Sequence, residues 1–291
     1  MIKGAGLGFR REMLDMQEEL AARKPDFLEV APENWIPFGG SLGKQFASIA
    51  EQYPFVCHGL SLSLGSFAPL DVEFVKSVKK FFQQHNILLY SEHLSYCSGE
   101  GHLYDLMPIP FTEEAVKHVS ARIAQVQDIM EQTIAIENVS YYAAPDQQMS
   151  EIEFLTAILD EADCALLLDV NNIYVNSVNH RYNGEDFLKA LPSERIAYGH
   201  VAGHYNEADD LIVDTHGADV IDGVWELQKL AYELHGVYPT LLERDFNLPP
   251  INELLDEVDK LRSTQTITDK QTQPMRDFFA HNRAPLAKEE V

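Results

Sequence analysis

The sequence predicts an α/β protein folded as a (β/α)8 TIM barrel. Short, nearly continuous apolar runs alternate with longer amphipathic runs, and this pattern repeats about eight times over roughly 250 residues. Apolar runs of this kind are what a parallel sheet buried on both faces requires. A doubly wound open sheet is the alternative arrangement of such units. The glycine run GAGLGF near the start lacks a helix at the spacing of a dinucleotide-binding loop.

The apolar runs are predicted as the strands of the barrel. They include DFLEV, ILLYS and CALLLDV, and several of them end directly before a polar segment such as APENW or EHLSY. The predicted strands are residues 4–10, 26–30, 55–60, 87–91, 133–139, 164–170, 195–201 and 238–242.

The amphipathic runs between them are predicted as helices. Asp71 and Thr112 are candidate N-caps, and Ser150 and Glu153 have the spacing of a capping box. Two polar stretches, residues 171–184 and the segment from 202 through His216, are predicted as loops. The predicted helices are residues 12–22, 42–52, 69–85, 112–131, 185–190, 220–235 and 251–261, with one more that begins at Ser150.

Residues 263–291 differ from the rest in composition. We expect residues 1–262 to form the metal-binding barrel and residues 263–291 to form a C-terminal tail. The run STQTITDKQTQP is polar and ends in proline, which indicates a linker or a surface strap. The run MRDFFAHNRAPL could form a short docking helix or belong to a disordered tail.

Charge and cysteine content exclude several classes of protein. The formal net charge is −24, and the 22 Lys and Arg residues are scattered, so no basic stripe for nucleic acid is expected. Cys57, Cys97 and Cys164 fit neither a disulfide framework nor a CxxC zinc site. The N-terminus lacks the apolar core of a signal peptide, and no apolar run approaches the roughly 20 residues of a membrane span. We therefore expect a reduced, cytoplasmic protein that binds neither nucleic acid nor membrane.

Polar residues that can bind metals lie at the ends of six predicted strands. In a TIM barrel the C-terminal strand ends open on one face, so residues far apart in sequence converge there. The segment IAYGHVAGHYNEADDLIVDTHG is the densest part of this set. The strand-end residues are His58, Glu92, His93, Glu137, Asn138, Asp169, Asn171, Asn172, His200, His204, Asp214, His216, Glu243, Arg244 and Asp245.

Each of these residues also has an ordinary structural explanation. His58 could be a hydrogen-bonded core histidine, and His204 and His216 could be solvated loop residues. A carboxylate such as Glu137 or Glu243 could pair with an arginine, and Asp169 could cap a turn. However, clustered buried carboxylates repel one another, and too few Lys and Arg lie nearby to neutralise them. Bound cations are the simplest common explanation.

The number of candidate ligands exceeds the need of one ion. A single catalytic zinc takes about three protein ligands, so this set is enough for about two or three ions. All donors are nitrogen or oxygen, which suits iron, manganese or zinc, and strand alternation predicts that Cys57 points away from the site. The predicted metal ligands are His58, His93, Glu137, Asp169, Asn172, His200 and Glu243, with His204, Asp214 and His216 on the loop side.

The same segments resemble the multinuclear non-heme iron-dependent oxidative enzymes, a bacterial family that includes relatives of the methanobactin oxazolone synthase iron subunit. The motifs are ENW, CHGLSLS, SEHLS, IENVS, LDVNN, HVAGH, DTHG and LLERD, in this order over residues 3–262. The resemblance implies a xylose-isomerase-like barrel that holds two or three iron ions. It also implies dioxygen-dependent modification of a cysteine in a ribosomally synthesised peptide, with a small leader-binding partner protein.

The resemblance also implies a division of the ligands. One ion would be held by His58, His93 and Glu137. A second would share Glu137 as a bridge and add Asp169, His200 and Glu243. A third would take Asn172, His204, Asp214 and His216. Catalytic roles would fall to Glu137, Glu243 and Asp245. Asp245 would orient a ligand or move a proton, and a salt bridge to Arg244 is its ordinary alternative.

Two other functions are compatible with the same ligands. The first is a di-zinc or di-manganese hydrolase or isomerase that acts on a phosphoester or a sugar. The second is a non-catalytic metal-binding protein whose acidic surface recruits a partner.

Overall fold

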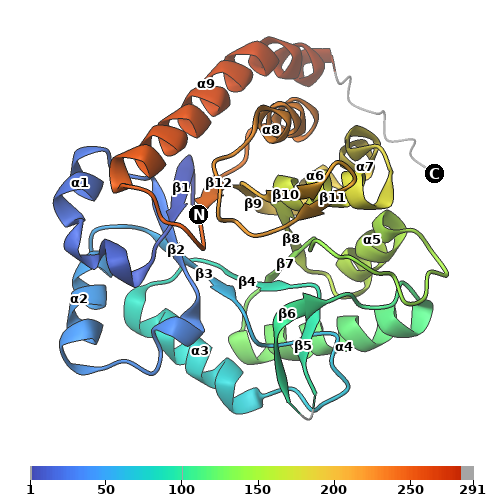
Figure 1. The fold of residues 1–291 in the computed structure, drawn as a ribbon, viewed down its shortest axis with the longest axis horizontal. Coiled ribbons are helices and arrows are strands. Elements are labelled where there is room, and N and C mark those ends of the chain that lie inside the picture. The colour runs from blue at the N-terminus through green and yellow to red at the C-terminus, as the bar shows by residue number, and fades with distance from the viewer. Residues whose placement is uncertain (1, 100, 283–291) are drawn as a thin grey trace, which may run out of the picture.

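The computed structural model describes residues 2–99 and 101–282 of the 291-residue chain. Eight parallel strands close into a barrel in the order β1-β12-β9-β8-β7-β4-β3-β2, which confirms the predicted (β/α)8 fold. Figure 1 shows the helices arranged around these strands. The barrel strands are β1 (Ala5–Gly8), β2 (Phe27–Val30), β3 (Phe55–Gly59), β4 (Tyr90–His93), β7 (Ala135–Glu137), β8 (Ala165–Asp169), β9 (Ile196–Ala202) and β12 (Thr240–Glu243).

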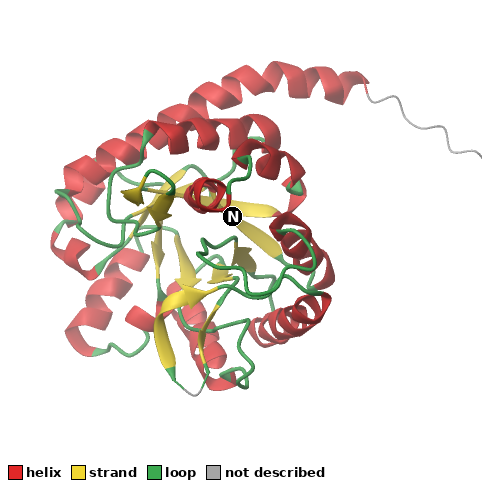
Figure 2. Cartoon of the chain, turned by 45° about the vertical axis from the view of Figure 1, so that its right-hand side comes forward, coloured by secondary structure: helices red, strands yellow, loops and turns green. Residues whose placement is uncertain are grey.

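The helices form the outer layer, which Figure 2 shows in red around the yellow strands. The three predicted N-caps are present: Asp71 accepts from the Phe74 amide, Thr112 accepts from the Ala115 amide, and Ser150 forms a capping box with Glu153. The α-helices are α1 (Gln17–Ala22), α2 (Gly40–Ala50), α3 (Val72–His85), α4 (Glu113–Met130), α5 (Glu151–Glu161), α6 (Val170–His180), α7 (Gly184–Ala190), α8 (Asp222–His235) and α9 (Ile251–Asn282). Short 3-10 helices cover Arg11–Asp15, Pro32–Asn34 and Ser193–Arg195.

Two antiparallel hairpins extend the loops at the C-terminal ends of the strands. The strands β5 (Tyr96–Ser98) and β6 (His102–Met107) follow β4, and β10 (Tyr205–Ala208) and β11 (Leu211–Val213) follow β9. The second hairpin occupies part of the segment predicted as a continuous loop from 202 through His216. Its short strands pair only with each other, so the barrel pattern gave no signal for them.

The prediction of a loop over residues 171–184 is wrong, because helix α6 covers most of it. Asp169 caps this helix by accepting from the Asn172 amide at 2.6 Å. Asn171, Asn172 and Asn176 are buried, and Asn176 is bonded to the backbone of the loop after β7. These three asparagines therefore bond to other parts of the protein rather than to solvent.

The helix predicted to end at residue 261 continues to Asn282 as part of α9. Gln265 is buried, and its side-chain amide donates to the carbonyls of Gly4 at 3.1 Å and Tyr238 at 3.2 Å. Gln265 therefore bonds to the backbone just before β1 and β12, within a stretch that was predicted as a linker or surface strap. Residues 283–291 of the predicted tail lie outside the described residues.

The core has two parts, separated by the barrel wall. The larger part lies between the strands and the helices and includes Cys57, which points away from the barrel interior as strand alternation predicts. The smaller part fills the barrel and consists of Ile2, Phe27, Val56, Ala135, Leu167, Tyr198 and Leu241.

No described helix is both long and apolar enough to cross a membrane.

Candidate metal centre

The candidate metal centre lies inside the barrel, above the apolar layer. Strand register brings its members together: His93 pairs with Glu137 across β4 and β7, and Asp169 pairs with His200 across β8 and β9. His58, Glu137, Asp169 and His200 are at most 4% exposed. Four groups of three residues could each hold an ion. Within each group, one ligand atom from every residue lies within 4.8 Å of the other two. The groups are His58–His93–Glu137, Glu137–Asp169–His200, Asp169–His216–Glu243 and Glu29–His200–Glu243.

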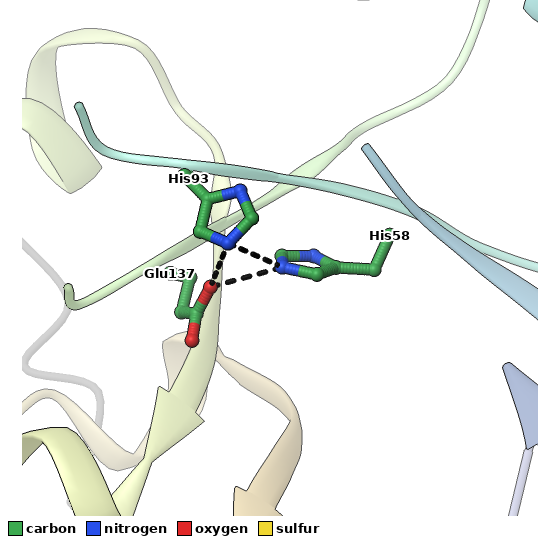
Figure 3. A group of neighbouring side chains, drawn as sticks. All are labelled: His58, His93 and Glu137. Carbon is green, nitrogen blue, oxygen red and sulfur yellow. Dashed lines mark hydrogen bonds and ion pairs between the residues drawn. The ribbon is translucent and has the colours of Figure 1, made fainter. Parts of the chain in front are cut away.

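The first group joins the ends of β3, β4 and β7. Figure 3 shows the two imidazoles and the Glu137 carboxylate pointing toward one another. The His58 Nε2 atom lies 3.0 Å from Glu137 Oε2 and 3.1 Å from His93 Nε2, and His93 Nε2 lies 3.3 Å from the same oxygen. Three donor atoms thus converge on one position, with the ligands that the resemblance implies for one ion.

The charges of this group are strongly coupled in the metal-free protein. Burial opposes the charged form of His58, but Glu137 outweighs it and raises the pKa of His58 to about 9. Burial and the neighbouring His58 lower the pKa of His93 to about 4. Burial also opposes the charged form of Glu137, yet the two histidines lower its pKa to about 2. A metal ion would replace the proton that His58 carries here.

The remaining groups share ligands with the first and with one another. His200 Nδ1 lies 2.9 Å from Glu243 Oε2 and 3.9 Å from Asp169 Oδ2. His216 Nδ1 lies 3.3 Å from the same Glu243 oxygen, and its Nε2 atom lies 2.8 Å from Asp214 Oδ1. The groups therefore form one continuous cluster rather than separate sites.

Unsatisfied polar atoms support cation binding at this cluster. Buried polar atoms nearly always have a hydrogen-bond partner, and an ion would satisfy those that lack one. Imidazole nitrogens with carboxylate and amide oxygens suit iron, manganese or zinc. Within the described residues, Asp169 Oδ2, Asn172 Oδ1 and His204 Nε2 are buried without a hydrogen-bond partner, whereas Glu137 Oε2, His200 Nδ1 and His216 Nε2 have only the ion-pair contacts given above.

Among the residues expected to bind a third ion, His204, Asp214 and His216 do not form a group of ligand atoms within 4.8 Å of one another. His204 Nδ1 is bonded to Asn171 Oδ1 at 2.7 Å, and Asn171 donates to Asp214 Oδ1 at 2.9 Å. Asn172 instead lies beside Glu137, to which it donates at 3.1 Å. His216 approaches Asp169 and Glu243, as described above. His204 Nδ1 thus reaches Asp214 through the Asn171 side chain, while its buried Nε2 atom has no hydrogen-bond partner.

Asp245 contacts a ligand and an arginine at the mouth of the barrel. Its Oδ2 atom lies 3.2 Å from His216 Nδ1, and its Oδ1 atom accepts a short hydrogen bond from Arg10. Arg244 contacts Asp219 and Glu257 instead, so the alternative of an Arg244–Asp245 salt bridge is not present. Asp245 thus contacts His216, one of the candidate ligands.

Glu29 is the main residue of the cluster that sequence reasoning missed. It lies on β2, two residues after Phe27, and is 2% exposed. Its carboxylate accepts from the Tyr198 hydroxyl at 2.7 Å and lies 3.1 Å from His200 Nε2. The signal was present, since a single acid in the apolar run DFLEV shares the inward face with Phe27.

Comparison with solved structures agrees with the fold. The chain superposes on an L-ribulose 3-epimerase with a TM-score of 0.62 and 12% identity, covering 98% of this chain and 100% of that one. Endonuclease IV from Thermus thermophilus gives a TM-score of 0.58 at 14% identity, with 92% and 99% coverage. A xylose isomerase domain protein from Alicyclobacillus acidocaldarius gives 0.57 at 12%, with 91% and 100% coverage. The barrel is therefore xylose-isomerase-like.

Sequence comparison gives the family. A UPF0276 protein of Shewanella sediminis is 62% identical over 260 residues, which cover 89% of this chain and 94% of the relative. A UPF0276 protein of Pseudomonas aeruginosa is 53% identical over 264 residues, with 91% and 93% coverage. The family model described as "RiPP precursor modification enzyme MbnB/TglH/ChrH", for ribosomally synthesised and post-translationally modified peptides, matches residues 4–266. The chain belongs to this family of peptide-modifying enzymes.

Proposed function

We propose that this protein is a multinuclear non-heme iron enzyme that uses dioxygen to modify a cysteine of a ribosomally synthesised peptide. The observation that carries the proposal is the continuous cluster of ligand groups, in which Glu137, Asp169, His200 and Glu243 each belong to more than one group. Shared carboxylates are suited to holding two or three ions close together. Membership of a peptide-modifying family supplies the substrate class.

The ligands divide among the ions as follows in this proposal. His58, His93 and Glu137 hold one ion, and Glu137, Asp169, His200 and Glu243 hold a second. Iron bound there would supply electrons for dioxygen and a Lewis acid that lowers the pKa of a substrate thiol. A third ion, where present, would use Asp169, Glu243 and His216, with Asp214 placed against His216 Nε2.

Residues around the ligands would control protons and water. Asp245 Oδ2 lies beside His216 Nδ1, and its side chain is 35% exposed, so this oxygen can take a proton at the solvent edge. Arg10 holds the other oxygen of Asp245 and lies 3.8 Å from Glu243 Oε1. The apolar layer that includes Phe27 and Leu241 closes the barrel below and keeps water out from that side.

The proposal extends to partners and location. A cysteine-containing peptide would be the substrate, and a small partner protein would bind its leader segment. The three cysteines of the chain are free and buried, which agrees with the reduced, cytoplasmic location that we propose.

The test is dioxygen uptake by iron-loaded protein. Protein purified without air would be analysed for metals, loaded with ferrous iron, and mixed with cysteine peptides encoded beside its gene. We expect two or three irons per chain and dioxygen uptake that requires the peptide cysteine, with a Cys→Ser peptide as the control. Iron-loaded protein that consumes no dioxygen with any such peptide would contradict the proposal. Turnover of a sugar or phosphoester with zinc or manganese would instead support the hydrolase or isomerase alternative.

A further inference from the structure

A buried chain of hydrogen bonds runs beneath the cluster and joins two of its histidines. His58 Nδ1 lies 2.7 Å from Ser91 Oγ, which lies 2.6 Å from the Tyr198 hydroxyl. Tyr198 lies 2.7 Å from a Glu29 oxygen, and Glu29 lies 3.1 Å from His200 Nε2. All five side chains are at most 4% exposed.

We propose that Glu29, Tyr198 and Ser91 are positioning residues that fix the tautomers of His58 and His200, so that each presents an unprotonated nitrogen to the metal ions. This inference rests on the proposed metal cluster, but it does not depend on iron or on the peptide substrate. It assigns one role to the three residues: Ser91 and Tyr198 belong to no ligand group, and Glu29 belongs to one, with His200 and Glu243.

The direction of each hydrogen bond follows from the chemistry of Glu29. A carboxylate only accepts, so Tyr198 must donate its single hydroxyl proton to Glu29. Ser91 then donates to the Tyr198 oxygen at 2.6 Å in preference to the Cys57 carbonyl at 3.4 Å, and with either acceptor the serine oxygen is left to accept from His58 Nδ1. With its proton on Nδ1, a neutral His58 has a bare Nε2 atom, which is the nitrogen that faces Glu137 and His93.

The same carboxylate acts on the other histidine. His200 Nε2 donates to Glu29, so the bare nitrogen of neutral His200 is Nδ1. That atom faces Glu243 Oε2 at 2.9 Å and Asp169 Oδ2 at 3.9 Å. One carboxylate on β2 therefore sets the tautomers of two ligands on β3 and β9. His93 is set separately, since its Nδ1 atom donates to the Gly59 carbonyl at 2.9 Å.

The position of Tyr198 within the barrel explains why a tyrosine lies at the centre of this chain of hydrogen bonds. Tyr198 belongs to the apolar layer with Phe27 and packs against it edge-on, with the ring centroids 6.5 Å apart. Its hydroxyl reaches out of this layer to Ser91 and Glu29. A phenylalanine there would fill the same space but would leave a gap in the hydrogen-bond chain.

The tautomers can be read directly by nuclear magnetic resonance. Protein with nitrogen-15-labelled histidine would be loaded with zinc, which is diamagnetic. We expect the His58 proton on Nδ1 and the His200 proton on Nε2. A His58 proton on Nε2, or a His200 proton on Nδ1, would overturn the inference. This measurement uses the wild-type protein, so it holds even if a variant fails to fold.

A double-mutant cycle, measured by cobalt affinity, tests the chain of hydrogen bonds itself. We expect Tyr198→Phe and Ser91→Ala each to weaken cobalt binding at the His58 position roughly 10- to 100-fold, and the double variant to be no weaker than one of them. Tyr232→Phe is the matched control, because this buried hydroxyl contacts Thr240 Oγ1 at 2.6 Å instead. Wild-type affinity in Tyr198→Phe, or additive losses in the double variant, would overturn the inference.

The two proposals can fail separately. If the wild-type protein bound neither cobalt nor zinc, the proposed metal function would fail. The protein could instead bind both metals but show the opposite tautomers, wild-type affinity in Tyr198→Phe, or additive losses in the double variant. In that case only the positioning role would fail. A purely structural role would lower the melting temperature of Tyr198→Phe and leave the His58 tautomer unchanged.

Discussion

The strand side of the cluster, made of His58, His93 and Glu137, differs from its loop side, made of Asp214 and His216, in what holds the side chains. The strand side is fixed by sheet register, since β3, β4 and β7 are consecutive neighbours in the barrel. The loop side lies in the connection between β9 and α8, where side chains from elsewhere do this work.

Backbone conformation marks the same difference. His216 has a φ of 49°, in the left-handed region that a residue with a side chain seldom adopts. Its carbonyl accepts from the Asp245 amide at 2.9 Å, which helps to hold this conformation. Such strain is typical of functional loops and costs about 1–3 kcal/mol. The strand side needs no such strain, so we expect it to bind metal more firmly than the loop side.

Removal of the Glu137 carboxylate should cause the largest change in metal binding on the strand side. Glu137 belongs to two ligand groups, so Glu137→Gln should weaken metal binding on the strand side roughly 100-fold or more and abolish peptide-dependent dioxygen uptake. Metal analysis and an oxygen electrode would measure this. Glu131→Gln is a control at an exposed carboxylate. Full metal content and uptake in Glu137→Gln would contradict the shared-ligand arrangement.

Alanine substitutions of His216 and His204 should have different effects on metal binding. His216→Ala should lose about one ion per chain, because His216 groups with Asp169 and Glu243. His204→Ala should keep the ion count and weaken binding about 10-fold, because it acts on Asp214 through Asn171. Metal content and cobalt titration of both variants would test this. Equal loss of an ion in the two variants would show that His204 is itself a ligand.

Sequence alone was sufficient for the barrel and for the convergence of the strand-borne candidate ligands. Parallel strands buried on both faces give apolar runs, and a barrel brings their C-terminal ends together, so His58, His93, Glu137, Asp169 and His200 could be assigned to one site. Glu29 was missed because it lies within its strand rather than at the strand end. Attention to the inward face of each strand would have found it.

The rest depended on contacts between elements that leave no local pattern. Asn176 reads as a loop residue, yet it is buried in α6 and bonded to the loop after β7. Gln265 reads as part of a polar linker, yet it bonds to carbonyls of the barrel. Polarity indicated exposure in both cases, and only the folded partner satisfies these amides. The contact between His204 and Asn171 also depends on the fold, although His204 was predicted as a metal ligand on the loop side.

The stability of the metal-free protein should depend on pH through the strand side, and that of the metal-loaded protein should not. The pKa of His58 is raised to about 9, so the His58–Glu137 pair stabilises the metal-free protein fully below about pH 6.5 and loses this effect as pH rises through 9. The pKa of Glu137 is lowered to about 2, so its contribution is present above about pH 4.5 and is lost as pH falls through 2.

We therefore expect the metal-free protein to lose about 3 kcal/mol of unfolding free energy between pH 6 and 10 from His58. Urea unfolding at a series of pH values would measure this, with metal-free His58→Gln as the control; its slope should be smaller and due to the other raised histidines, His200 and His216. Zinc-loaded protein should show no such loss, because the ion has already displaced the proton. An equal slope in His58→Gln would assign the effect to other groups.

The smallest expected effect tests how the loop side is held. Ser140 Oγ donates to Asp214 Oδ2 at 2.9 Å, and the Asp214 amide donates to the Tyr142 hydroxyl at 2.9 Å. Loss of one such hydrogen bond costs about 1 kcal/mol, so Ser140→Ala should weaken the loop-side ion about five-fold. Cobalt titration would resolve it, with Ser177→Ala as a control, since that hydroxyl bonds to the Tyr174 carbonyl. Because Ser140 acts on the cluster only through Asp214, the strand-side ion should keep its affinity, and equal weakening of both ions would mean that the two sides form a single cooperative unit.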